Sequence, residues 1–339
     1  MKKLALVLAA VVAATLMLTN TGFAASKTLQ VIKKRGALRC GVNPNTPGYA
    51  SLDSKGVYQG FDTDFCRAIA AAIQVDVQFF PLTGKERFPA LQSGEVDMLS
   101  RRTTWTMSRD TRLGFQFAAV TYYDGQGFIV RKKSGIKSAK ELDGATVCVA
   151  TGTTTELNLA DYFRKNKMKL KALTFESGDV VRSTYESGRC DAMTGDASSL
   201  AANKTIMKDP RAHLILPEII SKEPLAPLSR HGDNEFNDII RWVINAIIIA
   251  EEKGITQANV EEVATTSNDP EVQRMLGRTG SMGKDLGLDA KWALRAIKVV
   301  GNYEELFERH LGLDTPLGLP RGYNRLWNKG GILYAPPVR

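Results

Sequence analysis

The chain has few of the residues that bind transition metals in proteins. Only four cysteines and three histidines occur among 339 residues, and no histidine lies close to a cysteine along the chain. No C-x-x-C spacing occurs, so the cysteine pattern argues against a zinc site. A phosphate-binding loop ending in Gly-Lys-Ser/Thr and a Ser-His-Asp motif are also missing. The sequence therefore predicts no metal ion, no cofactor and no catalytic residue.

Long apolar segments are nearly absent as well. The longest, residues 4–17, follows Met-Lys-Lys and precedes Gly22-Phe23-Ala24, which has small residues at the positions that a signal peptidase reads. The run is too short to span a bilayer comfortably, and a retained membrane anchor is the alternative. We interpret residues 1–24 as a signal peptide. The mature protein, beginning near Ala25, is expected to be soluble and exported to the periplasm.

Basic side chains outnumber acidic ones but are spread along the chain. The formal net charge is +9 at pH 7, while the charged (24%) and hydrophobic (43%) fractions are ordinary for a globular protein. The densest basic groups, at residues 33–35 and 164–171, are not part of a basic stripe interleaved with aromatic residues. We therefore expect a solvated basic surface and no nucleic-acid partner.

The cysteines, Cys40, Cys66, Cys148 and Cys190, form an even set. In an exported chain such a set favours disulfide bonds, for which three connectivities are possible. The pairing Cys40–Cys66 and Cys148–Cys190 is favoured because each pair then lies within one compact unit. Each bond would close a loop of tens of residues and add roughly 3–4 kcal/mol to stability.

Segments typical of strands and of helices alternate over much of the chain. The predicted strands are residues 38–42, 75–81, 127–131, 146–150 and 170–175, and the predicted helices are residues 62–73, 85–92, 138–142, 153–166 and 178–187. Alternation with short links indicates an α/β fold with mostly parallel sheets. Beyond Asp233 only helices are predicted, at residues 234–253, 257–265, 270–276 and 289–310, before an irregular segment at residues 312–339 that is rich in Gly and Pro.

Two segments of the chain resemble each other. Residues 91–98 read LQSGEVDM, and residues 185–193 read YESGRCDAM. Each is typical of a helix that ends near a Gly and leads into a buried strand, since Gly accepts the left-handed conformation that ends helices. The repetition favours two similarly built lobes. Coincidence is the alternative, because helix–Gly–strand junctions are common.

Several motifs occur in a particular order. They are RCGVN at residues 39–43, GVYQGFDTD at 56–64, TTWTMSRD at 103–110, YYDGQGF at 122–128, VCVATGTTT at 147–155 and GRCDAMTGD at 188–196. Together they resemble the extracytoplasmic amino-acid-binding proteins of ABC importers, the family 3 solute-binding proteins, over about residues 30–255. The tail, residues 321–337, is similar to that of the longer general L-amino-acid-binding subfamily.

The resemblance implies the two-lobed periplasmic-binding-protein fold of type II. This is an α/β fold in which each lobe holds a mostly parallel sheet flanked by helices, and two crossing strands join the lobes. Residues 25–125 and 225–339 would form lobe 1, with a helical C-terminal extension, and residues 126–224 would form lobe 2. The implied function is that of a monomeric receptor that binds free L-amino acids, with polar and acidic ones favoured, and delivers them to the permease subunits of an ABC transporter. ATP would bind to a separate ATPase and not to this chain.

The matched motifs also imply a set of ligand-binding residues. Arg109 matches the position that grips the ligand's α-carboxylate, to which a guanidinium can bind through both oxygens. Thr153 and Thr154, at a helix start, would donate through amides and hydroxyls to the same carboxylate. Asp196 matches the carboxylate that pairs with the ligand's ammonium group. The alternatives are a surface position for Arg109 and helix capping for Thr153, Thr154 and Asp196.

Four further positions bear on the ligand. Thr104 matches a position whose hydroxyl and carbonyl groups contact it, and Tyr49 stands where relatives place an aromatic lid. Arg102 stands where relatives usually have a small polar residue, so it either adds a cation for acidic ligands or points outward. Asn43 replaces an aspartate of many relatives, which would ease the binding of acidic side chains.

An enzyme on the same scaffold is the alternative function. Cyclohexadienyl dehydratases resemble this fold and act on a small amino or keto acid. Such an enzyme needs an acid in the cleft beyond the groups that hold the zwitterion. Glu156 and Glu176 are the candidates, although both fit more simply as residues of a helix or loop surface. Since one fold hosts several functions, only the site can separate these two classes.

Overall fold

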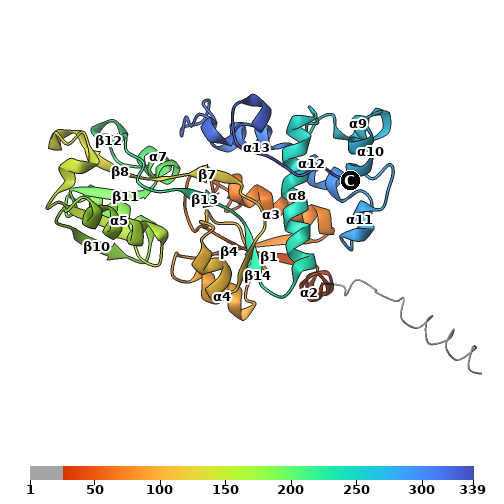
Figure 1. The fold of residues 1–339 in the computed structure, drawn as a ribbon, viewed down its shortest axis with the longest axis horizontal. Coiled ribbons are helices and arrows are strands. Elements are labelled where there is room, and N and C mark those ends of the chain that lie inside the picture. Colours follow the sequence, from red (N-terminus) through yellow and green to blue (C-terminus); the bar gives the residue numbers. More distant parts are fainter. Residues whose placement is uncertain (1–25) are drawn as a thin grey trace, which may run out of the picture.

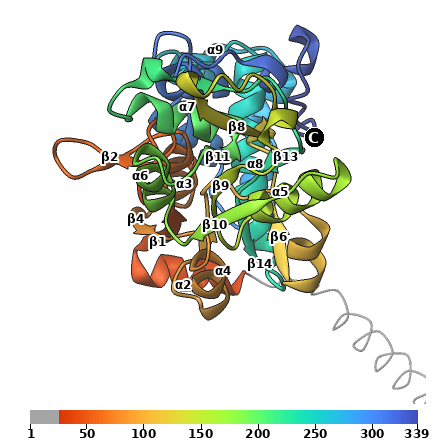
Figure 2. The same ribbon diagram turned by 90° about the vertical axis from the view of Figure 1, so that its left-hand side faces the viewer.

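The computed structural model describes residues 26–339, so the predicted signal peptide lies outside the described residues. The described chain is built around two five-stranded sheets. Each sheet belongs to a lobe of its own, and the two lobes lie side by side along the long axis of the molecule (Figure 1). In Figure 2 the second lobe faces the viewer. The α/β architecture with two lobes agrees with the prediction.

The first sheet has the strand order β4-β1-β5-β14-β6. Its strands are β1 (Ala37–Val42), β4 (Asp76–Pro81), β5 (Met98–Leu99), β6 (Phe115–Phe117) and β14 (Leu228–Arg230). β1 pairs in parallel with β4 and β5, because the helices α3 (Phe61–Ile73) and α4 (Arg87–Ser93) carry the chain back between strands. β14 pairs antiparallel with β5 and β6, so the sheet is mixed.

The second sheet repeats this plan with the order β10-β9-β11-β8-β12. Its strands are β8 (Gln126–Arg131), β9 (Thr146–Ala150), β10 (Lys171–Phe175), β11 (Ala192–Asp196) and β12 (His213–Ile215). β9 is parallel to β10 and β11, with α5 (Thr154–Lys165) and α6 (Gly178–Glu186) between them in sequence. β8 runs antiparallel to β11 and β12, and α7 (Ala197–Thr205) follows β11.

Two short strands join the lobes. The chain leaves the first lobe through β7 (Tyr122–Asp124) and returns through β13 (Glu223–Leu225). The strands pair antiparallel, with Glu223 opposite Asp124. The two crossing strands predicted from the resemblance are therefore present. A separate hairpin, β2 (Ser51–Leu52) and β3 (Tyr58–Gln59), projects from the first lobe (Figure 2).

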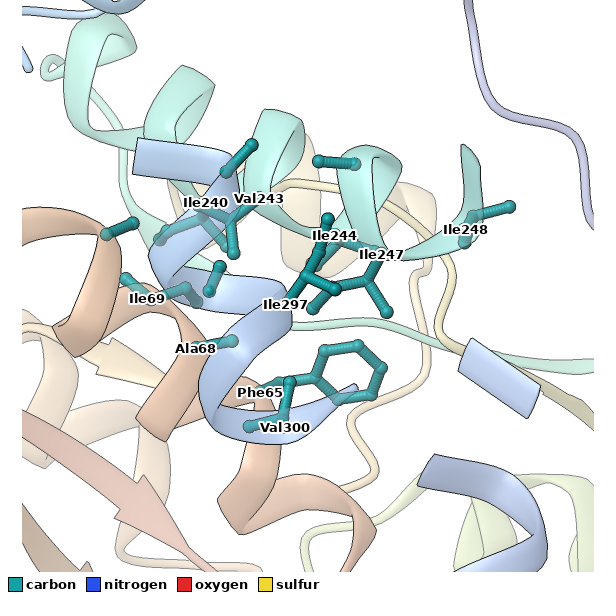
Figure 3. Close-up of a cluster of buried hydrophobic side chains, with 14 of the residues drawn as sticks. Phe65, Ala68, Ile69, Ile240, Val243, Ile244, Ile247, Ile248, Ile297 and Val300 are labelled. Carbon is teal, nitrogen blue, oxygen red and sulfur yellow. The ribbon is translucent and has the colours of Figure 1, made fainter. Parts of the chain in front are cut away.

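The largest hydrophobic core lies in the first lobe. It is formed where α3 packs against α8 (Asn234–Glu252) and α12 (Trp292–Val300). In Figure 3, Phe65 and Ile69 of α3 lie near Ile240 and Ile244 of α8 and Ile297 of α12, and all five are fully buried. Burial of each such side chain stabilises the fold by about 1.5–3 kcal/mol. This core holds α3, whose Asp62 carbonyl accepts from the Ser100 hydroxyl next to the cavity-lining residues Arg101 and Arg102.

One predicted helix is in fact two. Residues 289–310 form α12 and α13 (Tyr303–His310), separated by Gly301 and Asn302. Gly301 has a φ angle of 86°, which interrupts the helical backbone. The Asn302 side chain accepts from the Glu305 backbone N–H, and the Glu305 side chain accepts from the Asn302 N–H, so a capping box starts α13. The prediction of one continuous helix was wrong because this cap lies inside a helical pattern.

The C-terminal extension braces the crossing strands. It comprises α9 (Val260–Thr266), α10 (Pro270–Met275), α11 (Met282–Asp285), α12, α13 and an irregular tail, while α2 (Lys27–Arg35) opens the described chain. In the tail, Asn324 accepts from the Tyr123 N–H at 2.7 Å and donates to the Tyr123 carbonyl at 3.2 Å. Arg321 forms a buried ion pair with Glu251 at 2.9 Å. The tail is thus fixed to both α8 and β7.

Candidate ligand-binding site

A cavity of about 140 Å³ lies between the lobes. It is lined by loops that follow β1, β4 and β5 of the first sheet and β9, β10 and β11 of the second. The parallel strands of both sheets therefore point their carboxyl ends at it, the usual ligand position in α/β sheets. The cavity is smaller than the roughly 300–1,000 Å³ of clefts that take drug-sized ligands, which favours a small solute.

The lobes touch each other across the mouth of the cleft. Lys85 of the first lobe forms an ion pair with Glu176 of the second at 2.5 Å. The Arg87 guanidinium donates to the Gly152 carbonyl at 3.4 Å. A Cβ atom on Gly84 would lie 3.2 Å from the Thr151 carbonyl oxygen, so the two backbones approach closely. The cleft is closed in this structure.

Three guanidinium groups line the first-lobe side of the cavity. They belong to Arg87, Arg101 and Arg102. Burial lowers the pKa of Arg101 to about 9 and holds that of Arg87 well below its ordinary value. Within residues 26–339, the Nε atom of each has no hydrogen-bond partner, and neither Arg87 nor Arg101 forms an ion pair. Since burial of an unpaired charge is unfavourable, the cavity favours an anionic group beside these arginines.

Arg102 points into the cleft, which decides between the two orientations left open by the sequence. Its Nη2 donates to Thr46 Oγ1 at 3.2 Å, and Nη1 lies 3.9 Å from Asp196 Oδ2 across the cavity. The backbone adopts a φ angle of 49°, which non-glycine residues rarely do. Such strain is often retained at functional sites.

Asp196 brings a carboxylate from the second lobe. It ends β11 and precedes α7, but its side chain makes no capping hydrogen bond. The pKa of Asp196 is raised to about 7, mainly by burial and also by the carboxylates of Asp124 and Glu223, against the opposing effect of Arg102. Its carboxylate therefore lacks a close cationic partner within the described chain, since Arg102 remains 3.9 Å away.

Arg109 lies one layer behind the cavity surface. Arg109 is only 6% exposed. Its Nη1 donates to the Thr104 carbonyl at 2.8 Å, and its guanidinium carbon lies 5.2 Å from the centre of the Phe88 ring. Burial lowers the pKa of Arg109 to about 10, although Glu223 and Asp196 oppose this effect. Arg109 is thus not a surface arginine. In this closed form it contacts the backbone that carries Thr104, which itself lines the cavity.

Tyr49 is also placed beneath the cavity surface. The residue is fully buried, and its ring packs edge-on against Phe61 and Tyr122 in the first-lobe core. The Arg102 guanidinium lies over the ring, 5.1 Å from its centre. The aromatic group therefore supports Arg102 from below, which differs from the lid position expected from the sequence.

The three threonines expected at the ligand all line the cavity. Thr153 caps α5, since its hydroxyl accepts from the Glu156 N–H at 3.2 Å and donates to the Ala150 carbonyl at 2.7 Å. The hydroxyl of Thr154 donates to Glu223 at 2.9 Å, and that of Thr104 donates to the same oxygen at 2.5 Å. Thr153 and Thr154 also stand at the start of α5, where the first backbone N–H groups of a helix have no partner within the helix.

Four charged groups at the cleft were not expected from the sequence: Arg87, Arg101, Asp124 and Glu223. Burial raises the pKa of Asp124 to about 6, although hydrogen bonds from Ser198 and Gly125 oppose this. Asp124 and Glu223 lie opposite each other on the crossing strands. A carboxylate within a short strand that must cross between lobes is a signal that could have found Asp124 and Glu223, but no such signal points to Arg87 or Arg101.

The two candidate acids of the enzyme alternative have other partners. Glu176 is 62% exposed and pairs with Lys85 at the cleft mouth. Glu156 accepts from the Gly152 N–H at 3.0 Å and from the Thr151 hydroxyl, at the start of α5. Glu156 is half-buried and Glu176 is exposed, so neither carboxylate lies in the buried environment typical of a general acid.

The disulfide pairing favoured from the sequence is confirmed. Cys40 bonds to Cys66 within the first lobe, and Cys148 bonds to Cys190 within the second, with Cα–Cα distances of 6.3 and 5.7 Å. Across residues 26–339 no group of three or more His, Cys, Asp or Glu side chains is arranged to hold a metal ion. In the same part of the chain, no helix combines the length and apolar character needed to cross a bilayer.

Comparison with known proteins places these features in context. Residues 38–312 match the family of bacterial extracellular solute-binding proteins, family 3. The glutamate/glutamine/aspartate/asparagine-binding protein BztA of Rhodobacter capsulatus is 53% identical over 94% of this chain and 95% of its own. The general L-amino acid-binding periplasmic protein AapJ of Rhizobium johnstonii is 52% identical over 98% of each chain.

A solved structure shares the whole architecture. The ABC transporter/periplasmic binding protein from Brucella ovis with glutathione bound is 52% identical to the chain. It superimposes with a TM-score of 0.89 over 92% of this chain and 99% of the Brucella chain. Both lobes and the C-terminal extension therefore have a counterpart in a solved structure.

Proposed function

Because the chain belongs to the bacterial extracellular solute-binding proteins of family 3, we propose that its cleft captures free L-amino acids outside the cytosol for an ABC transporter. The observation that carries the proposal is the charge arrangement around one closed cavity. Asp196 approaches from the second lobe, and Arg87, Arg101 and Arg102 approach from the first. A free amino acid can place its ammonium group at Asp196 on the second lobe while its side chain reaches the arginines on the first, so it can contact both sides of the cavity at once.

The zwitterion would bind between the two lobes. Its ammonium pairs with Asp196, whose pKa is raised mainly by burial and by the nearby carboxylate of Asp124. Its α-carboxylate lies at the start of α5, where the backbone N–H groups of Thr153 and Thr154 and the positive end of the helix favour an anion. Arg109 adds positive charge from behind Thr104 and fixes the position of that residue.

The ligand's side chain would reach the arginine cluster. Arg87 and Arg101 line the cavity without ion-pair partners among residues 26–339, and Arg102 has one at 3.9 Å. Asn43 also lines the cavity and carries no negative charge to repel an acidic group. This supports ligands whose side chains end in a carboxylate or amide, in agreement with the name of the Rhodobacter relative. Tyr49 would act on the ligand only through Arg102.

A γ-glutamyl peptide is a second candidate ligand. The solved Brucella relative holds glutathione, which presents a free amino-acid end and a second carboxylate at the other end of the molecule. The cavity here continues beyond Asp196 to Ser177, Asp179 and Asn203, where polar side chains line its outer part. A longer ligand could keep its zwitterion at Asp196 and extend in that direction.

The remaining assignments follow from the same function. Residues 1–24 would direct export to the periplasm, and the mature chain would act as a monomer. The lobes would divide at the crossing strands, with residues 25–125 and 225–339 in lobe 1 and 126–224 in lobe 2. The closed form would then dock on the permease subunits of the transporter, while a separate ATPase supplies the energy. The protein is thus a binding protein, and the dehydratase alternative is not favoured.

Calorimetric titration of the ligand-free mature protein tests the proposal. The ligands are the twenty L-amino acids, D-glutamate and glutathione, with prephenate incubated separately to detect turnover. We expect several polar or acidic L-amino acids to bind in a 1:1 ratio, D-glutamate to bind far more weakly, and no ligand to be consumed. Absence of binding to every L-amino acid would refute the proposal, and turnover of prephenate would favour the enzyme.

A further inference from the structure

Glu223 accepts four side-chain hydrogen bonds at the junction of the lobes. It lies on the crossing strand β13 and is 1% exposed. Its Oε2 atom accepts from the hydroxyls of Thr104 and Thr154, at 2.5 and 2.9 Å. Its Oε1 atom accepts from the Ser221 hydroxyl at 2.6 Å and from the Asn158 amide at 2.8 Å. Glu223 does not line the cavity, but both threonines do.

This arrangement fixes the direction of two hydroxyl groups. A threonine hydroxyl has one proton to donate and two lone pairs to accept with. Because the protons of Thr104 and Thr154 are directed at Glu223, only lone pairs of their oxygen atoms remain for a ligand in the cavity. The two hydroxyls lie 3.3 Å apart, so they form one patch of acceptors.

The carboxylates near this patch also favour a cation in the cavity, while the guanidinium of Arg109, which donates to the Thr104 carbonyl, does not line the cavity. Asp196 lines the cavity, and the carboxylates of Asp124 and Glu223 both raise the pKa of Asp196 by repulsion. A cation between Asp196 and the two hydroxyl oxygens would reduce that repulsion. An anion in the same place would face a carboxylate and two oxygen lone pairs, which is unfavourable.

We infer that Glu223 is a positioning residue that turns the Thr104 and Thr154 hydroxyls into acceptors, so that the ligand's ammonium group binds beside them. This assignment rests on the proposed capture of free amino acids. It reverses the role expected from the sequence for the Thr154 hydroxyl, which was to donate to the α-carboxylate. The backbone N–H groups at the start of α5 still donate to the ligand's α-carboxylate.

A ligand pair that differs only in the ammonium group tests the inference. The pair is the tightest-binding amino acid of the calorimetric screen and its des-amino acid, which for L-glutamate is glutarate. The ratio of the two dissociation constants measures how strongly the ammonium is recognised. Glu223→Met removes the acceptor while keeping a side chain of similar length. Since a hydrogen bond to a charged group is worth about 1.5–3 kcal/mol, we expect the ratio to fall by about tenfold or more.

The control is Glu218→Met, because Glu218 lies in the segment that leads into the same strand, β13. Glu218 accepts from the Ser138 hydroxyl at 2.6 Å outside the cavity, so its loss should leave the ratio unchanged. In Glu223→Gln the amide oxygen can still accept from both threonines when its NH₂ group faces Ser221 and Asn158, provided that the Asn158 amide turns over to present its oxygen. We expect this variant to recover most of the ratio that Glu223→Met loses. If Glu223→Met does not fold, Thr154→Val serves in its place, with a reduced ratio expected.

Two results separate the possible failures. If the unchanged protein binds amino acids and Glu223→Met weakens both ligands by the same factor, Glu223 has only a structural role and the inference is wrong. If the unchanged protein binds no amino acid, the proposed function itself fails. A selective loss of affinity for the amino acid, with the des-amino acid little affected, supports the inference.

Discussion

Replacement of Arg101 by methionine should stabilise the empty protein and weaken its preference for acidic ligands. Arg101 is 7% exposed, lines the cavity and forms no ion pair within the described part of the chain. Desolvation by burial is the main reason that its pKa is lowered from 12.5 to about 9, which corresponds to about 5 kcal/mol of unfavourable free energy for the charged side chain. That value is an upper bound, because local relaxation reduces the cost of burying a charge.

The expected net effect on stability is smaller than this bound. Methionine keeps most of the aliphatic contacts of arginine without the charge, so we expect Arg101→Met to raise the free energy of unfolding of the ligand-free protein by about 1–3 kcal/mol. For a chain of this size the thermal midpoint should rise by about 2–10 °C. Differential scanning calorimetry at neutral pH, without ligand, measures this change.

The same substitution should weaken ligand binding, although it stabilises the ligand-free protein. If Arg101 holds the carboxylate of an acidic side chain, its removal should weaken L-glutamate relative to L-glutamine by about 10- to 100-fold. Arg112→Met is the control, because Arg112 is exposed on the turn that carries Arg109 and should change neither quantity by much. A lower midpoint together with an unchanged ratio of the two dissociation constants would mean that Arg101 has a structural partner and that the reasoning is wrong.

Three other changes test separate parts of the site. Arg109→Ala should abolish measurable amino-acid binding without unfolding the protein, since it removes both the buried cation and the donor to the Thr104 carbonyl; near-normal affinity would contradict this role. Because the pKa of Asp196 is raised from 3.8 to about 7, the ligand-free protein should lose stability as pH rises from about 4 to about 7. As pH rises through the upper part of that range, amino-acid binding should become stronger and should release a proton. Titrations in buffers of different ionisation enthalpy detect this proton release. A pH-independent affinity would argue against Asp196 as the partner of the ligand's ammonium group. Gly84→Val places a side chain where a Cβ atom would lie 3.2 Å from the Thr151 carbonyl, so the closed form should be disfavoured. We expect ligand dissociation to be accelerated about tenfold, while the thermal midpoint of the ligand-free protein stays unchanged. Unaltered dissociation in a stopped-flow experiment would show that the lobes do not approach this closely.

The sequence predicted features that depend on local pattern and motif order. The two-lobed α/β fold, the crossing strands and both disulfides were predicted, because strand–helix alternation and the matched motifs span residues 30–255. The helix over residues 62–73 was placed within one residue of its observed start at Phe61. The continuous helix predicted over residues 289–310 was wrong, since Gly301 and Asn302 carry a local stop and start signal that the longer apolar pattern obscured.

The candidate site could be predicted from the sequence only in part. Five of the seven expected binding residues line one cavity: Thr104, Thr153, Thr154, Asp196 and Arg102. Tyr49 and Arg109 lie one layer deeper, and no local pattern distinguishes a side chain at the cavity surface from one that supports it. Glu223 was missed because its role depends on residues 119, 69 and 65 positions away in sequence, which only the folded chain brings together.

The closed cleft contains charged groups that lack close partners, and this property can couple closure to ligand binding. Arg101 is buried on the first lobe without an ion pair among residues 26–339, and Asp196 on the second lobe has only Arg102, 3.9 Å away, so closing the empty cleft leaves both poorly satisfied. An acidic amino acid supplies its side-chain carboxylate to Arg101 and its ammonium group to Asp196. Micromolar affinity needs about 8 kcal/mol, and two satisfied charge clusters can contribute that after ordering costs. Because the ligand contacts both lobes only in the closed form, its binding shifts the equilibrium towards that form, which is the difference a transporter could recognise.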